Sequence, residues 1–132
     1  MSAIDELLTA ARARLDRVTP EQAAAAVEQG ALLVDIRPRA LRAAQGEVPG
    51  ALLLERNYLE WRCDPTSDAR FPEAVDTDVA WIVLCQAGFT SSLAAASLHD
   101  LGLHRATDVI GGFEAWQAAG LPTQPGGGPP RP

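Results

Sequence analysis

The stretch Trp81–Leu98, WIVLCQAGFTSSLAAASL, joins a short apolar run to a run rich in alanine. Its first four positions are consecutive apolar residues, which are typical of a short strand buried on both faces of a parallel sheet. The residues after the turn favour a helix, and Gly88 stands in the turn between the two elements. Cys85 therefore lies at the carboxyl end of a predicted buried strand and shortly before a predicted helix.

Other apolar runs alternate with helical patterns along the rest of the chain. Three further strands are predicted at 31–34, 51–54 and 107–110. Periodic apolar spacing and cap residues predict helices at 3–17, 20–29, 39–45, within 55–62, from about 90 to 101, and at 112–119. This alternation favours an α/β fold of three layers, in which a mostly parallel central sheet of four to five strands has helices on both faces.

Composition narrows the kinds of partner that this chain can have. Its 132 residues carry 17 acidic and 11 basic side chains, and the net charge of −6 disfavours a nucleic-acid surface because such surfaces need clustered cations. Every basic residue is arginine, so Schiff-base or general-base chemistry by lysine is excluded. No apolar run is long enough to cross a bilayer, and the first residues do not resemble a secretory signal. We expect a cytoplasmic monomer that binds neither nucleic acid nor membrane.

The pattern divides the chain into three segments. Residues 1–18 are expected to form an N-terminal helix, and residues 19–122 a single α/β domain. Residues 123–132 contain a run of three glycines among prolines, and this composition predicts a disordered tail.

The turn after Cys85 has the features of an anion-binding loop. Ligands of open α/β sheets bind beyond the carboxyl ends of the strands, where the amides and the dipole of the following helix favour a thiolate. Gly88 can adopt positive φ and turn the loop amides inward, and Thr90 or Ser91 is a natural N-cap. The alternative is that Cys85 is a small hydrophobic side chain that fills the core.

Four further motifs resemble those of a single-domain rhodanese, a member of the sulfurtransferase family. They are a helix start, a strand end, a middle turn with its next residue, and a closing glycine pair with its final turn. The motifs stand in order, with the cysteine loop between the middle turn and the closing pair. In the sequence these four motifs are TPEQ (19–22) to Gly30, VDIR (34–37), GEVPGA (46–51), and GGFEAW (111–116) with GLP (120–122).

The resemblance implies a persulfide mechanism. Cys85 would take the sulfane sulfur of a donor such as thiosulfate and pass it to a thiol or cyanide acceptor, which is a small molecule or a protein. The terminal sulfur would be bound by backbone amides of the loop, and neither a metal nor an organic cofactor would be needed. An alternative is a binding or regulatory module of the same fold with weak or no activity towards thiosulfate. The loop residues that would bind the sulfur are Gln86, Ala87, Gly88, Phe89, Thr90 and Ser91.

The loop departs from the family pattern in one respect. Related loops often close with an arginine, whereas this loop has Thr90 and so supplies no cation to an anionic donor. Phosphatase relatives carry an arginine six positions after the cysteine, where Ser91 stands here, and phosphoryl transfer is therefore disfavoured. Arg56 or Arg62 could replace the missing cation, although surface pairs with glutamate are the more common role of such residues.

Several other residues are interpreted as structural. Asp35 and Arg37 are predicted to form an ion pair that braces a strand end, and Glu47 is interpreted as a surface residue. Cys63 could resolve a persulfide as a disulfide, but an inert thiol is preferred because nothing places it near Cys85. Trp61 is expected in the core or half-buried, and Phe89 at the rim of the pocket.

Overall fold

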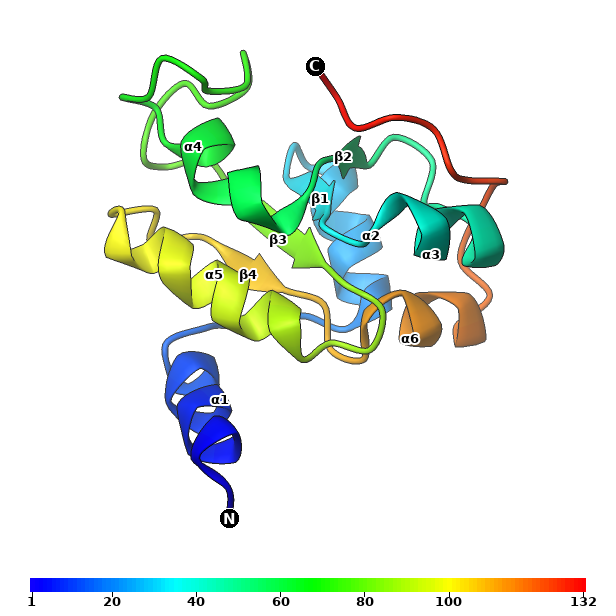
Figure 1. Cartoon of the computed structure of the whole chain (residues 1–132), viewed down its shortest axis with the longest axis horizontal. Helices are drawn as coiled ribbons and strands as arrows, with labels where there is room; N and C mark the ends of the chain where they lie inside the picture. The colour runs from blue at the N-terminus through cyan, green and yellow to red at the C-terminus, as the bar shows by residue number, and fades with distance from the viewer.

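Four parallel strands form the centre of the molecule in the computed structural model, which describes residues 1–132 (Figure 1). Their order across the sheet is β2-β1-β3-β4, and β1 and β3 pair over their full lengths. The α/β prediction is confirmed, with a sheet at the lower end of the predicted four to five strands. The strands are β1 (Leu32–Asp35), β2 (Leu52–Leu53), β3 (Trp81–Leu84) and β4 (Thr107–Asp108).

Helices cover both faces of this sheet, as the sequence predicts (Figure 1). Helices α4 and α5 lie on one face, and α2 and α6 lie on the other. None of the helices is both long and apolar enough to span a membrane. The helices are α1 (Ala3–Ala13), α2 (Pro20–Glu28), α3 (Arg39–Gln45), the 3₁₀ turn η1 (Arg56–Tyr58), α4 (Leu59–Cys63), α5 (Thr90–Asp100) and α6 (Gly112–Ala118).

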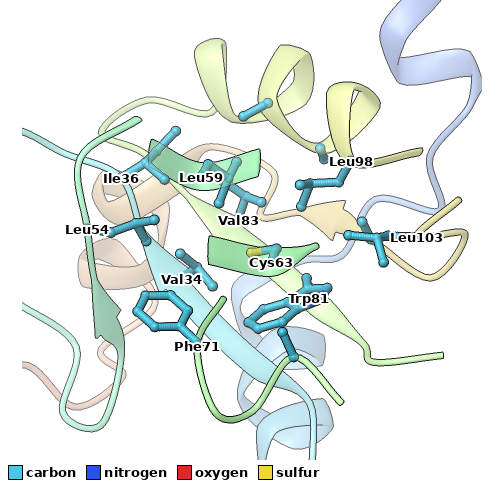
Figure 2. Close-up of a cluster of buried hydrophobic side chains, with 14 of the residues drawn as sticks. Val34, Ile36, Leu54, Leu59, Cys63, Phe71, Trp81, Val83, Leu98 and Leu103 are labelled. Atoms are coloured by element: carbon cyan, nitrogen blue, oxygen red, sulfur yellow. The ribbon is translucent and has the colours of Figure 1, made fainter. Parts of the chain in front are cut away.

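Alternation along β3 explains why the sequence shows an uninterrupted apolar run. Trp81 and Val83 point into the core layer under α4 and α5, which Figure 2 shows, whereas Ile82 and Leu84 point into the layer under α2 and α6. Side chains of a strand alternate between faces, and a strand with a helix layer on each face must be apolar at every position. The double burial continues to the last residue of β3, and Cys85 follows directly at that end of the strand.

The N-terminal helix is shorter than predicted. Helix α1 ends at Ala13 rather than at residue 17, and Arg14 is its C-cap. It contacts α5, but Ile4 and Leu7 each remain 57% exposed, so its apolar spacing does not bury a full face. The extended residues after α1 lead past β4, where Val18 forms a parallel bridge with Val109.

The C-terminal residues differ from the predicted disordered tail. They run over α3 towards β2, and Glu47 and Gln124 exchange two backbone hydrogen bonds of 2.8 Å. A Cβ atom on Gly126 would lie 2.4 Å from the carbonyl oxygen of Arg42, so the glycine permits an approach that no side chain would allow. Composition alone suggested flexibility because it does not reveal that the glycines are packed against a helix.

Two side chains are placed differently from the prediction. Glu47 is 5% exposed and pairs with the buried Arg42, so it is a structural acid rather than a surface residue. Its carboxylate also accepts the Gly127 amide at 3.0 Å, and this contact needs the tail in place. Trp61 is 59% exposed on α4 rather than packed in the core.

Candidate active site

The cysteine loop begins where β3 ends in the middle of the sheet. Cys85 directly follows β3 and is only 4% exposed. Its Sγ accepts a hydrogen bond from the Gly88 amide at 3.2 Å, so the chain curls back over the thiol before α5 starts at Thr90. The sulfur therefore lies at the bottom of a short loop, between a buried strand and the first turn of a helix.

Gly88 gives the loop its curvature. Its φ is +85°, the left-handed region that the sequence predicts for this position. A Cβ atom here would lie 2.7 Å from the Gly111 nitrogen, which is a backbone atom that cannot turn aside. Both the backbone conformation and the space around it therefore require glycine.

The start of α5 differs from the predicted cap. Phe89 is the N-cap, and no side chain caps the helix. The Ser91 hydroxyl instead donates to Asp108 Oδ2 at 2.7 Å, and Thr90 is exposed at the rim. The sequence prediction failed because a buried carboxylate from β4 attracts the hydroxyl more strongly than the helix amides do.

The closing glycine pair, Gly111 and Gly112, lets the start of α6 pack against the cysteine loop. The Phe113 amide donates to the Cys85 carbonyl at 2.8 Å, and the Glu114 amide donates to the Gln86 carbonyl at 3.0 Å. A Cβ atom on Gly112 would lie 2.5 Å from that Cys85 oxygen, so α6 can approach the loop only through glycine. The first turn of α6 thus orients two loop carbonyls towards itself.

These carbonyl contacts also determine where the loop amides point. In a planar trans peptide the carbonyl oxygen and the next amide hydrogen point in opposite directions. The amides of Gln86 and Ala87 are therefore turned away from α6, and they donate to no other protein atom. The amides of Phe89, Thr90 and Ser91 also have no protein acceptor. The loop presents unpaired donors, which is the arrangement of an anion-binding nest.

A buried ion pair braces the neighbouring strand end. Arg37 and Asp35 lie 2.7 Å apart with side chains almost fully buried, which confirms the predicted structural pair. The Arg37 guanidinium also donates to Gln86 Oε1 at 3.2 Å and lies 4.0 Å from the centroid of the Phe113 ring. The pair thereby links the end of β1 to the cysteine loop and to α6.

Three charged residues at the loop were missed by the sequence reasoning. Arg12 and Arg17 donate to the Gly88 carbonyl at 2.8 and 3.1 Å. Arg17 also pairs with the fully buried Asp108, at 2.8 Å from Nε to Oδ1. The only available signal was the absence of a cation in the loop itself, and that signal does not say which distant arginine compensates for it.

The two arginines proposed to compensate lie elsewhere. Arg56 pairs with Glu60 at 2.8 Å, and Arg62 donates to the carbonyls of Ala69 and Pro132. Neither makes a hydrogen bond to the cysteine loop. The surface-pair interpretation describes Arg56, whereas Arg62 pairs with no glutamate and lies 4.2 Å from the centroid of the Phe71 ring. Arg56 does line a hollow of about 440 Å³ beside the end of β1, together with Ile36, Pro38, Arg39, Glu55 and Asn57.

That hollow lies close to the cysteine loop. Ile36 lines it, and the Ile36 amide donates at 3.0 Å to the carbonyl of Leu84, the residue before Cys85. A larger hollow of about 530 Å³ lies at the opposite, amino ends of the strands, where Leu32 and Thr107 line it. The smaller of these two hollows is therefore the one at the cysteine end of the sheet.

Cys63 is a core residue. It is the last residue of α4, Figure 2 shows its sulfur among apolar side chains, and the residue is fully buried. Burial, with a smaller contribution from the nearby Glu60 charge, raises the pKa of the thiol from its ordinary value of 9.0 to about 12. Both cysteines are free thiols. The protonated, enclosed Cys63 has the properties of the inert thiol that the sequence analysis preferred.

We expect Cys63 to react about a thousandfold more slowly with a thiol reagent in the folded protein than in urea at the same pH. Raising the thiol pKa from 9.0 to about 12 lowers the thiolate fraction by this factor near neutral pH. The measurement is the rate of labelling in Cys85→Ser, in which Cys63 is the sole thiol. Equal rates in the two conditions would contradict it. Because the raised pKa favours the folded state below about pH 9, its contribution to stability should fall between pH 9 and 12.

The rim of the loop is open to partners. Phe89 is 60% exposed, as predicted, and the Arg12 guanidinium lies 5.5 Å from the centroid of its ring. The two histidines lie away from the loop, since His99 Nε2 contacts the Ala106 carbonyl and His104 lies 3.4 Å from Asp78. The structure contains no group of three or more histidine, cysteine or acidic side chains that could hold a metal ion.

The comparison with known proteins agrees with this geometry. The family model of the rhodanese-like domain matches residues 19–119. The thiosulfate sulfurtransferase GlpE of Haemophilus influenzae is 36% identical over 106 residues, covering 80% of this chain and 90% of the relative. GlpE of Pseudomonas fluorescens is 39% identical over 101 residues, covering 76% and 84%. A solved structure from Rhodopseudomonas palustris, described as a possible tyrosine phosphatase, is 31% identical with a TM-score of 0.83, covering 94% and 96%.

An α/β domain with a curled cysteine loop at the end of its central strand defines the class of protein. The chain belongs to the rhodanese-like family. Its similarity to the GlpE relatives over most of both chains makes it a sulfurtransferase within that family.

Proposed function

We propose that this sulfurtransferase carries sulfur as a persulfide on Cys85, with thiosulfate or a similar sulfane donor as its source. The observation that supports this most is the set of unpaired amides in the loop that encloses the Cys85 sulfur. A terminal persulfide sulfur is an anion, and backbone amides that have no other acceptor stabilise such a charge. The names of the GlpE relatives point to the same donor.

The proposed reaction has two balanced steps. The Cys85 thiolate attacks the outer sulfur of thiosulfate, the sulfur–sulfur bond of the donor breaks, and sulfite leaves with the bonding electron pair. Cys85 is then a persulfide, Cys–S–S⁻. A thiolate or cyanide acceptor attacks the terminal sulfur, which regenerates the Cys85 thiolate and releases a new persulfide or thiocyanate.

Phosphoryl transfer is less well supported, although one structural neighbour is described as a possible tyrosine phosphatase. A phosphate-binding loop of this type needs an arginine whose side chain enters the loop. The corresponding position is Ser91, which is fully buried and donates to Asp108. Arg12 and Arg17 contact the loop through the Gly88 carbonyl, which points away from the Phe89 amide of the same peptide.

Intact mass after incubation with thiosulfate tests the proposal. We expect the wild-type protein to gain one sulfur atom and to lose it when cyanide is added. Cys85→Ser should gain none, and Cys63→Ala should gain the same single sulfur as the wild type because Cys63 is enclosed in the core.

A wild-type mass that does not change with thiosulfate or polysulfide would overturn the proposed persulfide. The remaining reading would then be a rhodanese-fold binding module, whose partner capture should survive Cys85→Ser. A sulfur gained on Cys63 in the Cys85→Ser variant would overturn the assignment of the carrier.

A further inference from the structure

We propose that Arg12 and Arg17 are positioning residues, through which the segment before the domain holds the cysteine loop in its anion-binding form and supplies the positive charge that Thr90 does not. Both guanidiniums donate to one carbonyl, that of Gly88. The inference rests on the proposed function, and it adds a preference for anionic sulfur donors.

The two arginines fix the orientation of the peptide that joins Gly88 to Phe89. A carbonyl oxygen has two lone pairs, and the two guanidiniums occupy both on Gly88 at 2.8 and 3.1 Å. This holds the oxygen on the outer side of the loop, so the Phe89 amide of the same peptide is directed to the opposite side. The Phe89 amide has no protein acceptor and is free to bind an anion.

The arginines are themselves held in place by hydrogen bonds. Arg17 makes two hydrogen bonds to Asp108, which is fully buried, and that carboxylate also accepts the Ser91 and Ser92 hydroxyls. Arg12 Nε donates to the Ser92 hydroxyl at 3.1 Å. A side chain held by charge-assisted, partly buried hydrogen bonds has a better-defined position than an exposed side chain.

The arginines also bring positive charge to the loop. Two guanidiniums and one carboxylate leave one excess positive charge behind the loop, where a loop arginine is absent. Such a charge attracts an anionic donor towards the thiol and favours the persulfide anion once it has formed. Arg12 and Arg17 precede residue 19, where the match to the family begins, so the device lies outside the shared domain.

The test compares Arg12→Gln with Arg14→Gln, a matched change two residues along the chain. Arg14 pairs with the exposed Asp100 at the far end of α5, at 2.7 Å, and makes no contact with the loop. Cys85 is alkylated with iodoacetate, an anion, and with iodoacetamide, which is neutral and of similar size. The Cys85 peptide is followed by mass, so this readout does not require sulfur transfer.

We expect the ratio of the iodoacetate rate to the iodoacetamide rate to fall about fivefold in Arg12→Gln and to stay at the wild-type value in Arg14→Gln. The KM for thiosulfate should rise about fivefold in Arg12→Gln with a smaller change in kcat, and Arg12→Lys, which keeps the charge, should recover most of both effects. Arg17→Gln should act in the same direction.

Two results would overturn the inference. One is an Arg12→Gln protein with a wild-type alkylation ratio and KM, and the other is an equal loss in Arg12→Gln and Arg14→Gln, which would show a general effect of net charge. If the wild-type protein takes up no sulfur but Arg12→Gln still lowers the alkylation ratio, the proposed function is contradicted and the role of the arginines stands.

Discussion

Replacing Arg37 with methionine should lower the free energy of unfolding by about 3–5 kcal/mol. The change leaves Asp35 charged, fully buried and without its guanidinium partner, and it removes the bonds of Arg37 to Gln86 and to the Gly46 carbonyl. A carboxylate in this position is fully buried and has lost its cation, so only the backbone amide of residue 37, which donates to Asp35 Oδ1 at 3.0 Å, still offsets part of its desolvation. Urea unfolding followed by circular dichroism measures the difference.

Two control variants make this result specific. Arg14→Met removes an ion pair whose side chains are 44% and 69% exposed, and it should cost less than about 1 kcal/mol. The double variant Arg37→Met/Asp35→Leu removes both buried charges and should be more stable than Arg37→Met alone. A single variant as stable as the exposed control would mean that the buried pair does not brace β1.

Gly88→Ala should reduce sulfur loading on the order of a hundredfold and also destabilise the fold. The alanine Cβ would lie 2.7 Å from the Gly111 nitrogen, so either the cysteine loop or the start of α6 must move. A moved loop would no longer hold its amides around the Cys85 sulfur. The measurements are the rate of mass gain with thiosulfate and the midpoint of urea unfolding.

Gly102→Ala is the matched control for this variant. Gly102 has the same φ of +85°, but a Cβ atom there would meet nothing within 4 Å. The control therefore incurs the cost of a left-handed alanine, about 1–2 kcal/mol, without a steric clash. Comparable losses in both variants would show that backbone conformation alone accounts for the effect, and the contact with Gly111 would then have no role.

The sequence was sufficient for the fold because its elements carry local signals. The Thr19 capping box, the doubly buried run of β3 and the glycine turns each report on their own few residues, and all of them agree with the structure. The motif order then gave the family. Element ends were less certain, as the early end of α1 at Ala13 shows, because apolar spacing continues past the last helical turn.

The candidate site could be predicted only in those parts that depend on residues close together in the sequence. The strand, loop and helix pattern predicts where Cys85, Gly88 and the exposed Phe89 lie, and the structure places them there. The contacts of Arg12 and Arg17 with Gly88 span 76 and 71 residues, and no spacing rule links positions so far apart. The same reason explains the buried Glu47, whose partners come partly from the C-terminal residues.

Segments near the two ends of the chain each form backbone hydrogen bonds at one edge of the central sheet. Beyond β4, the Val18 amide donates to the Asp108 carbonyl and the Ile110 amide donates to Val18. Beyond β2, the Arg131 amide donates at 2.8 Å to the Leu53 carbonyl, a group that an edge strand leaves free. Unpaired edge groups are templates for strand addition between molecules. We therefore expect these segments to hinder strand addition at the outer strands, a role separate from sulfur chemistry.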